Sequence, residues 1–358
     1  MISKRLVMIA AAVAGMTLFP ASARAELETF VMGTTGQSNY STYGAPKPVD
    51  DNFSNWGGSL PTNPAGLAAS GISGTYRVKT SAVAALSDAI TSSGTGRSNF
   101  GPWTYSGSAA TNAGYGALGS ESHAVLSGNS DNATVNNAES YAIMRDSLSP
   151  TSPGVAAGSN GTMRLAVTVG GAMSVSGRGD VGMILRYDTG APRPGYATIN
   201  QTLLESSLVI YGNGYSVYGP HSSFGSYVTP AGMNLHVGAI TASGSPTDLS
   251  FGGVTTVYAT LPVTYGAATD FRMGMLTWAG VGNGDGTMDS AWAHTARISG
   301  IEMFDSAGNP VKDFSITSGS GTAYTASGVA VVPEGGTLVL SLAAAGAVVV
   351  RRRRKPAV

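Results

Sequence analysis

Hydrophobic and polar positions are patterned differently on the two sides of residue 161. From residue 162 onward, short runs with alternating apolar and polar positions are separated by clusters of Gly, Pro, Asn and Asp. These runs are TMRLAVTV, VGMILRYD, SLVIYG, MNLHVGAI, VTTVYATLPVTYG, FRMGMLTWAG, HTARISGIEMFD and VKDFSIT. Strands at this spacing, with no amphipathic helices between them, predict an antiparallel β-sandwich or jelly roll.

Residues 26–161 are more polar and rich in Gly, Ser and Asn, which predicts a loop-rich part of the same domain. Short strands are expected at Glu28–Met32, Thr75–Thr80 and Ser140–Arg145. A turn or two of helix is expected over Ser81–Ile90, because Val83, Leu86 and Ile90 fall at helical spacing. The expected single domain therefore covers residues 26–330, with regular strands in 162–330.

The stretch HTARISGIEMFDSAGNPV shows how local sequence specifies a sheet. Ala296 and Ile298 share one face, whereas Ile301 and Met303 continue in the opposite parity, so a β-bulge at Gly300 is predicted to restore a single buried face. The following DSAGNP is a turn signal. Paired strands are therefore expected at about Thr295–Phe304 and Val311–Thr317.

Composition supports the all-β class. The chain has 50 Gly and no Cys, so turn-forming residues are abundant and no disulfide can stabilise the fold. No fixed repeat period is found, which argues against a solenoid.

The first 25 residues have the order of a secretory signal peptide. Lys4 and Arg5 precede an apolar stretch from Leu6 to Phe19, and small-residue triplets follow it. We expect cleavage after Ala25, with Ala23 and Ala25 as the small residues of the cleavage site.

The last residues, 331–358, form a second targeting segment. A spacer with Pro333 and Glu334 precedes an apolar helix expected over 337–350, and a basic cluster spans 351–355. A helix of 14 residues reaches about 21 Å, short of the roughly 30 Å hydrocarbon core. The basic cluster changes this expectation, because such residues resist translocation and stay on the cytoplasmic side. Its arginines are Arg351, Arg352, Arg353 and Arg354.

This order of a Pro-Glu signature (VPEGG), a short apolar helix and a terminal Arg cluster resembles the PEP-CTERM sorting signal of exported Gram-negative bacterial proteins. The resemblance implies recognition by an exosortase-type membrane protease near Pro333 and Glu334, a transient inner-membrane intermediate, and release or attachment at the cell surface. Bacteria with such proteins often make an exopolysaccharide matrix. Gly335 stands where the family usually has Pro. A plain anchor that is never cut is the alternative. Residues 254–317 also look like terminal sandwich strands that recur in proteins with this signal.

The formal net charge becomes negative when both terminal segments are left out. The whole chain has 20 basic and 20 acidic residues, but residues 26–332 keep 12 basic and 19 acidic residues, a formal charge of −7. An acidic body argues against nucleic acid as a partner.

Catalytic motifs are missing: there is no G-x-S-x-G elbow, no H-E-x-x-H helix and no Walker loop. GRGDVG, residues 177–182, opens a strand rather than a helix, so we interpret it as a turn and not as a dinucleotide-binding loop. A polysaccharide hydrolase or lyase built from distant carboxylates stays open.

Candidate binding residues are few. Trp56, Trp103 and Tyr105 are expected on loops where flat rings could stack on sugars, the alternative being that they fill the ends of the sandwich. Asn283, Asp285, Thr287 and Asp289 stand at alternate positions in GVGNGDGTMDS, a weak calcium pattern that departs from the EF-hand spacing, with Asn283, Asp285 and Asp289 as the candidate ligands. The widely separated His123, His221, His236 and His294 predict no metal site.

The sequence thus predicts an exported, non-enzymatic β-sandwich with a structural or adhesive role at the cell surface or in the extracellular matrix. A carbohydrate-binding module for exopolysaccharide is the first alternative, and a polysaccharide-degrading enzyme is the second. No cofactor other than calcium is suggested.

Overall fold

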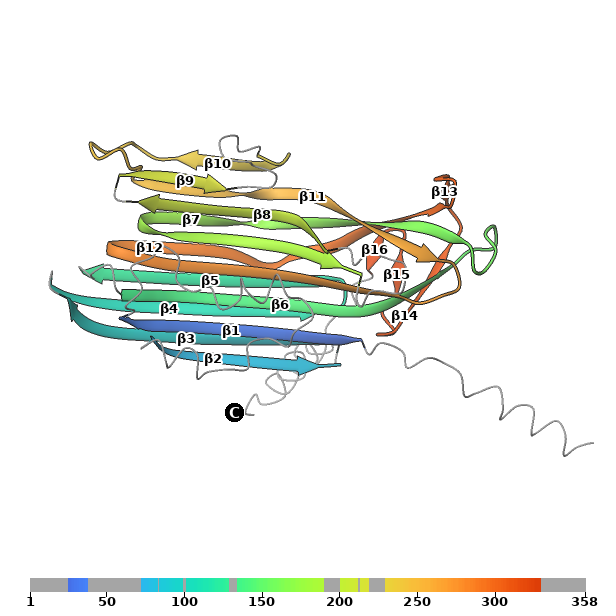
Figure 1. Ribbon diagram of the computed structural model, residues 1–358, viewed down its shortest axis with the longest axis horizontal. Helices are drawn as coiled ribbons and strands as arrows, with labels where there is room; N and C mark the ends of the chain where they lie inside the picture. The colour runs from blue at the N-terminus through green and yellow to red at the C-terminus, as the bar shows by residue number, and fades with distance from the viewer. Residues whose placement is uncertain are drawn as a thin grey trace, which may run out of the picture.

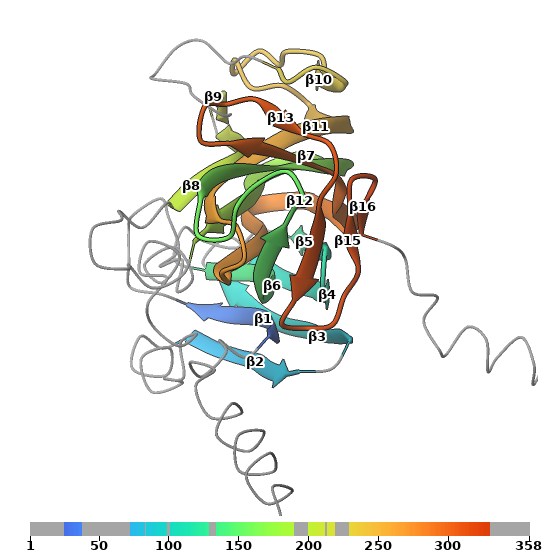
Figure 2. The same ribbon diagram turned by 90° about the vertical axis from the view of Figure 1, so that its right-hand side faces the viewer.

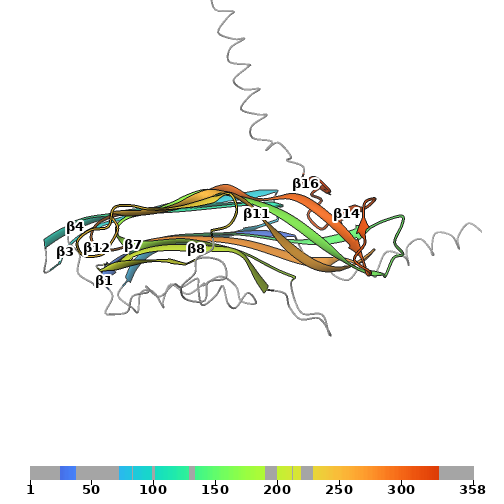
Figure 3. The same ribbon diagram turned by 90° about the horizontal axis from the view of Figure 1, so that it is seen from above.

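The computed structural model describes residues 25–37, 72–82, 84–98, 101–128, 134–189, 200–211, 213–218 and 229–329. In these ranges every strand pairing is antiparallel, and the strands join in one 16-stranded sheet that folds over on itself into two facing layers (Figures 1 and 3). The predicted all-β sandwich is therefore confirmed for this part of the chain. The described residues contain no helix that could cross a membrane. The expected signal peptide, sorting residues and apolar helix 337–350 lie outside these ranges, except for Ala25.

The two layers are two antiparallel sheets that share strands β7 (Asn160–Asp188) and β12 (Thr269–Asp305). The first sheet runs in the order β10 (Met233–Val237), β11 (Asp248–Thr264), the first part of β7, the last part of β12, β5 (Ala117–Gly128), β4 (Gly101–Gly114) and β3 (Ala85–Ser98). The second sheet runs in the order β9 (Gly214–Tyr218), β8 (Asn200–Tyr211), the last part of β7, the first part of β12, β6 (Thr134–Thr151), β1 (Glu26–Gln37) and β2 (Ile72–Ser81).

Strands β7 and β12 pass together from one sheet to the other. They pair along nearly their whole length as a two-stranded ribbon, and this ribbon folds over between the pairs Gly179–Val281 and Gly177–Gly286. Gly177 has φ +81°, which residues with a Cβ rarely adopt. The GRGDVG segment is thus part of the fold-over of the ribbon, and the acidic segment 282–286 forms its other strand.

The predicted bulge at Gly300 is confirmed. Ile298 pairs with Val167 and Gly300 pairs with Ala166, so Ser299 is an extra residue on β12. Because one inserted residue reverses the side-chain parity, both Ile298 and Ile301 are buried.

The predicted turn after β12 is also confirmed, but the strand after it is shorter than expected. Gly308 has φ +81°, and a carboxylate oxygen of Asp305 accepts hydrogen bonds from the backbone N–H of Ala307 and Asn309 at 2.9 and 2.8 Å. Strand β13 (Pro310–Val311) pairs with β12 over two residues only. The chain then leaves this hairpin.

The last strands cross one end of the sandwich (Figure 2). Strand β14 (Ser315–Ser318) pairs with β6, β15 (Tyr324–Thr325) pairs with β14, and β16 (Gly328–Val329) pairs with β15. The expectation that residues 311–317 pair with β12 throughout is therefore wrong beyond Val311. A buried carboxylate on β6, that of Asp146, provides hydrogen-bond acceptors that draw this segment to β6.

The expected helix over Ser81–Ile90 is wrong. The described residues there belong to the end of β2 and the start of β3, and a three-stranded meander of β3, β4 and β5 fills much of the stretch expected to be loops. The signal was hidden because inward positions on these strands hold Asp88 and several Ala and Ser residues, so period-2 alternation of large apolar residues is weak.

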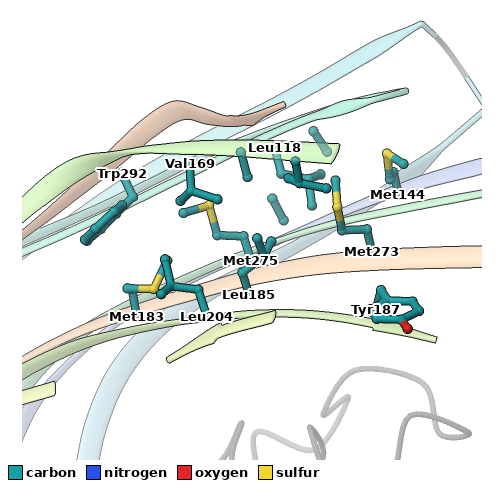
Figure 4. Packing of buried hydrophobic residues seen from close by; sticks show 14 of the residues in the cluster. Leu118, Met144, Val169, Met183, Leu185, Tyr187, Leu204, Met273, Met275 and Trp292 are labelled. Carbon is teal, nitrogen blue, oxygen red and sulfur yellow. The ribbon is translucent and has the colours of Figure 1, made fainter. Parts of the chain in front are cut away.

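Large apolar side chains fill the space between the sheets (Figure 4). They come from inward positions of β7, β12, β5, β6 and β8, and include Met183, Leu185, Met273, Met275, Leu118, Met144 and Leu204. Trp292 is fully buried, and the centroid of its ring lies 6.5 Å from that of Phe251. Burial of this kind has to stabilise the domain alone, since the chain has no disulfide.

A cluster of four hydroxyl groups bridges the two sheets inside this core. Ser120 and Ser122 on β5 face Ser140 on β6 and Thr277 on β12, and all four residues are buried. The Thr277 hydroxyl lies 3.0, 2.9 and 3.0 Å from those of Ser120, Ser122 and Ser140. Since small side chains replace large apolar ones here, the sheets approach closely and their polar groups satisfy one another.

Candidate functional site

Outward positions of the first sheet carry an exposed aromatic residue next to a cation. On β11, Ala259 and Leu261 point into the core. Because successive side chains of a strand point to opposite faces, Tyr258 points out of the sandwich. The side chain of Tyr258 is 54% exposed. Arg164 on β7 and Phe304 on β12 reach the same face, because β11, β7 and β12 are adjacent strands.

Arg164 is held between two rings and a carboxylate. Its guanidinium carbon lies 5.0 Å from the centroid of Tyr258 and 5.6 Å from that of Phe304. Its Nε donates a hydrogen bond to Glu302 Oε2 at 2.6 Å, and its Nη2 also contacts that oxygen. Cation–π and ion-pair contacts at such exposure each contribute about 0.5–1 kcal/mol. Together they fix the orientation of the arginine.

Hydroxyl groups adjoin this aromatic row. Thr168 Oγ1 donates to Ser299 Oγ at 2.7 Å and lies 3.4 Å from Thr256 Oγ1. We call the set Tyr258, Arg164, Glu302, Phe304, Thr168 and Ser299 the Tyr258 surface. An exposed ring can stack on the C–H face of a sugar, and the adjacent guanidinium, carboxylate and hydroxyl groups can bind sugar hydroxyls.

The aromatic residues proposed from the sequence lie elsewhere. Trp103 and Tyr105 are on strand β4, with only 8% and 3% of their surface exposed, so the expected loop placement is wrong for both. They point inward because β4 alternates, and their rings pack in the core, which leaves no ring face for a sugar. Trp56 lies outside the described residues.

Two of the three residues in the weak calcium pattern, Asp285 and Asp289, contact different partners, and the side chain of Asn283 lies outside the described part of the structure. Asp285 and Asp289 lie on the extended strand β12, and Asp285 Oδ1 accepts a hydrogen bond from Gly128 N–H at 2.6 Å. Asp289 lies 3.8 Å from His123 Nδ1 instead. Within the described part of the chain, no three His, Cys, Asp or Glu side chains are grouped as metal ligands.

Two acidic side chains on the outer face of the second sheet, Asp188 and Glu28, are paired with arginines. Arg272 Nε donates to Asp188 Oδ2 at 2.9 Å, and Arg145 Nη2 donates to Glu28 Oε2 at 3.0 Å. Burial raises the pKa of Glu28, and the charge of Arg145 opposes that rise.

An aromatic cluster lies along this same outer face. Phe30, Tyr141, Ile184, Leu276 and Trp278 are all buried there. The indole N–H of Trp278 donates a hydrogen bond to Oδ2 of Asp180, the aspartate of the GRGDVG segment, at 2.8 Å. With Trp278 only 6% exposed, this cluster presents no ring face to a ligand in the structure.

Sequence reasoning missed the Tyr258 surface, although part of the signal was present. The run VTTVYATLPVTYG predicts a strand, and its alternation puts Tyr258 opposite the buried Ala259 and Leu261. The neighbours of Tyr258 could not be read from the sequence, because Arg164 and Phe304 come from strands far away along the chain.

Comparisons with known proteins identify no family for this chain. No protein-family model matches it. No curated protein matches it significantly. A solved structure with some similarity is the CBM22-1–GH10 part of xylanase 10B from Clostridium thermocellum in complex with xylohexaose, at 10% identity and a TM-score of 0.10. The aligned part covers 56% of this chain and 26% of that chain. A likeness at this score supports no conclusion about fold or ligand.

Proposed function

We propose that this chain is an exported, non-enzymatic β-sandwich protein with a structural or adhesive role at the cell surface or in the extracellular matrix. Export and sorting rest on the terminal sequences: a signal peptide over 1–25 and a PEP-CTERM-like tail over 331–358. Between them lies an acidic domain that folds without disulfides.

The non-enzymatic role is supported by one observation on the carboxylates. Both oxygens of buried Asp146 accept hydrogen bonds from neutral donors, and Asp88 Oδ1 and Asp188 Oδ2 accept them from Arg77 and Arg272. A glycosidase needs two carboxyl groups facing each other across a cleft, one of them free to take a proton. Carboxylate oxygens that already accept such hydrogen bonds stabilise structure rather than exchange protons.

Intact mass of the secreted protein tests the sorting proposal. We expect a species that begins after Ala25 and ends near Pro333 and Glu334, and we expect replacement of Arg351–Arg354 by Gln to reduce tail removal. A secreted form that retains residues 335–358 would contradict the sorting proposal. Release of sugar products from isolated exopolysaccharide by the purified domain would contradict the non-enzymatic role.

Polysaccharide binding is a second candidate function, favoured by the exposure of Tyr258 beside Arg164 and Glu302. In this proposal the Tyr258 surface replaces the loop aromatics as the place where exopolysaccharide would bind. It is compatible with the first candidate, because adhesion to a matrix requires a surface that recognises the matrix.

A further inference from the structure

Strand edges of the sandwich differ in how they are protected. The outermost strands of the first sheet are β10 and β3, and those of the second sheet are β9 and β2. Strands β9 and β10 have five residues each, and β2 carries Arg77 and Lys79. Strand β3 has 14 residues and pairs only with β4 in the described part of the chain. Long unpaired edges can bind another strand, whereas short or charged edges resist it.

Hydrogen bonds from Lys79 and Arg77 show which residues of β3 point their backbone N–H and C=O groups away from β4. In an antiparallel pair, alternate residues turn their N–H and C=O away from the partner strand. Lys79 Nζ donates to the carbonyl of Ser87 at 3.0 Å, and Arg77 Nη1 donates to the carbonyl of Ala89 at 3.4 Å. The odd-numbered residues of β3 therefore form its outward edge.

The first half of that edge is capped by the chain itself. The buried carboxylate of Asp88 accepts a hydrogen bond from Arg77 Nη1 at 2.6 Å and lies 3.0 Å from Lys79 Nζ, and it also accepts the N–H of Ala89 at 2.9 Å. This arrangement holds both cations over the carbonyls of Ser87 and Ala89. It occupies the edge as far as Ala89.

In the part of the chain that the structure describes, no side chain caps the second half of the edge in this way. The outward backbone groups of Thr91, Ser93 and Thr95 have no hydrogen-bond partner among the described residues. These three side chains are exposed, small and uncharged, and the stretch from Ala89 to Gly96 contains no Pro and no charged residue. The features that usually prevent edge pairing are absent there.

We propose that the second half of β3, centred on Ser93, pairs antiparallel with the same segment of a second copy of this chain. A two-fold axis at Ser93 places Thr91 of each copy opposite Thr95 of the other, so the segment is its own complement. The segment Thr91–Thr95 carries no charged residue, so no like charges meet within it, and cross-strand Thr pairs are favourable in sheets. The first sheets of two molecules become one continuous sheet.

The same geometry limits the interface. About six backbone hydrogen bonds link the two copies, and pairing ends where the Asp88, Arg77 and Lys79 cluster occupies the edge. Because edge pairing buries little area compared with a standard interface of roughly 1,600 Å², the dimer is reversible and concentration-dependent. The inference goes beyond the proposed function, since it rests only on described strands and needs neither sorting nor polysaccharide.

Single cysteines test the pairing in a chain that has none of its own. In the paired form, Ser93→Cys puts two thiols opposite each other at the axis, at a separation that a disulfide can span. Ser106→Cys is the matched control, because Ser106 is the exposed partner of Ser93 on β4 and lies one strand inside the edge. Under mild oxidation of the purified exported domain we expect a Ser93→Cys dimer and monomeric Ser106→Cys. Equal cross-linking of the two would overturn the proposal.

Light scattering across a concentration series gives the second measurement. Ser93→Pro removes an outward N–H that the β3–β4 ladder does not use, so we expect loss of self-association with an unchanged melting temperature. Should Ser93→Pro fail to fold, Ser93→Lys places like charges at the axis, and Ser106→Lys controls for the added charge. A wild-type domain that stays monomeric at all soluble concentrations, or a Ser93→Lys variant that associates as the wild type does, would overturn the proposal.

Discussion

The phenol of Tyr324 donates a hydrogen bond to Oδ2 of Asp146 at 3.0 Å, across 178 residues of sequence. The same carboxylate accepts the backbone N–H of Ser147 and of Ser320, each at 2.9 Å, and the hydroxyl of Ser320 at 2.5 Å. One buried side chain thereby holds the C-terminal strands against β6 at the end of the sandwich (Figure 2).

Asp146→Ala is expected to destabilise the domain by about 3 kcal/mol or more, because it leaves several buried donors without an acceptor. Tyr324→Phe removes one donor and should cost about 1–2 kcal/mol. Urea unfolding of both variants and of the double variant gives the coupling energy. Additive effects of the two substitutions would contradict the bond.

Thr277→Val should cost about 1–3 kcal/mol, because valine keeps the shape of threonine but removes the hydroxyl that Ser120, Ser122 and Ser140 approach. Thr256→Val, on the exposed face of β11, is the control and should change stability by less than about 0.5 kcal/mol. Chemical denaturation compares the two variants. Equal effects would show that the hydroxyl cluster does not stabilise the contact between the sheets.

Gly177→Ala tests the fold-over of the β7–β12 ribbon. Gly177 and Gly308 both have φ +81°, so alanine should cost about 1–2 kcal/mol at either position through backbone strain alone. A Cβ at Gly177 would also collide with the carbonyl oxygen of Asp285, whereas a Cβ at Gly308 meets nothing within 4 Å. We expect Gly177→Ala to lower the melting temperature clearly more than Gly308→Ala does.

Alkaline pH should unfold the domain as its buried tyrosines ionise. Burial raises the pKa of Tyr105 to about 12 and raises those of Tyr141 and Tyr324 above the ordinary value of 10. The unfolded chain ionises near pH 10 while these phenols stay neutral in the fold, so their stabilisation is complete below pH 10 and is lost as pH rises. As pH rises, phenolate absorbance should appear at a higher pH in the folded protein than in the unfolded chain. It should increase together with loss of the circular dichroism signal.

Tyr258→Ala should weaken binding to isolated exopolysaccharide by roughly 2- to 10-fold if the Tyr258 surface is the binding site, since stacking on an exposed ring is lost. Arg164→Gln should also weaken binding by removing the cation between the rings. Tyr215→Ala, at another exposed tyrosine on β9, is the control. Affinity electrophoresis in exopolysaccharide measures all three, and an equal loss in the control would exclude a specific site.

Sequence reasoning succeeded where large apolar residues alternate and failed where small ones do. The bulge at Gly300 was predictable because Ile298 and Ile301 change parity within a few residues. The β3–β4–β5 meander was not, because its inward positions hold Asp88, Ala109 and Ser120, residues that equally suit a loop. Trp103 and Tyr105 were placed on a loop for the same reason.

Candidate sites were harder to predict than strands. The Tyr258 surface combines residues that meet only through strand pairing, such as Arg164 with Glu302. Asp88 on β3 meets Arg77 on β2 because the two sheets pack together. No spacing within one segment encodes these pairs, because register and strand order are set by long-range packing.

By itself, the sequence determined the all-β class, the local turn at Gly308 and the bulge at Gly300, because alternation and glycine placement act over a few residues. Only the tertiary structure decided that β7 and β12 fold over together, that Asp146 meets Tyr324, and that Tyr258 lies beside Arg164. These relationships depend on which strands become neighbours, and that choice minimises the free energy of the whole sheet rather than of any one segment.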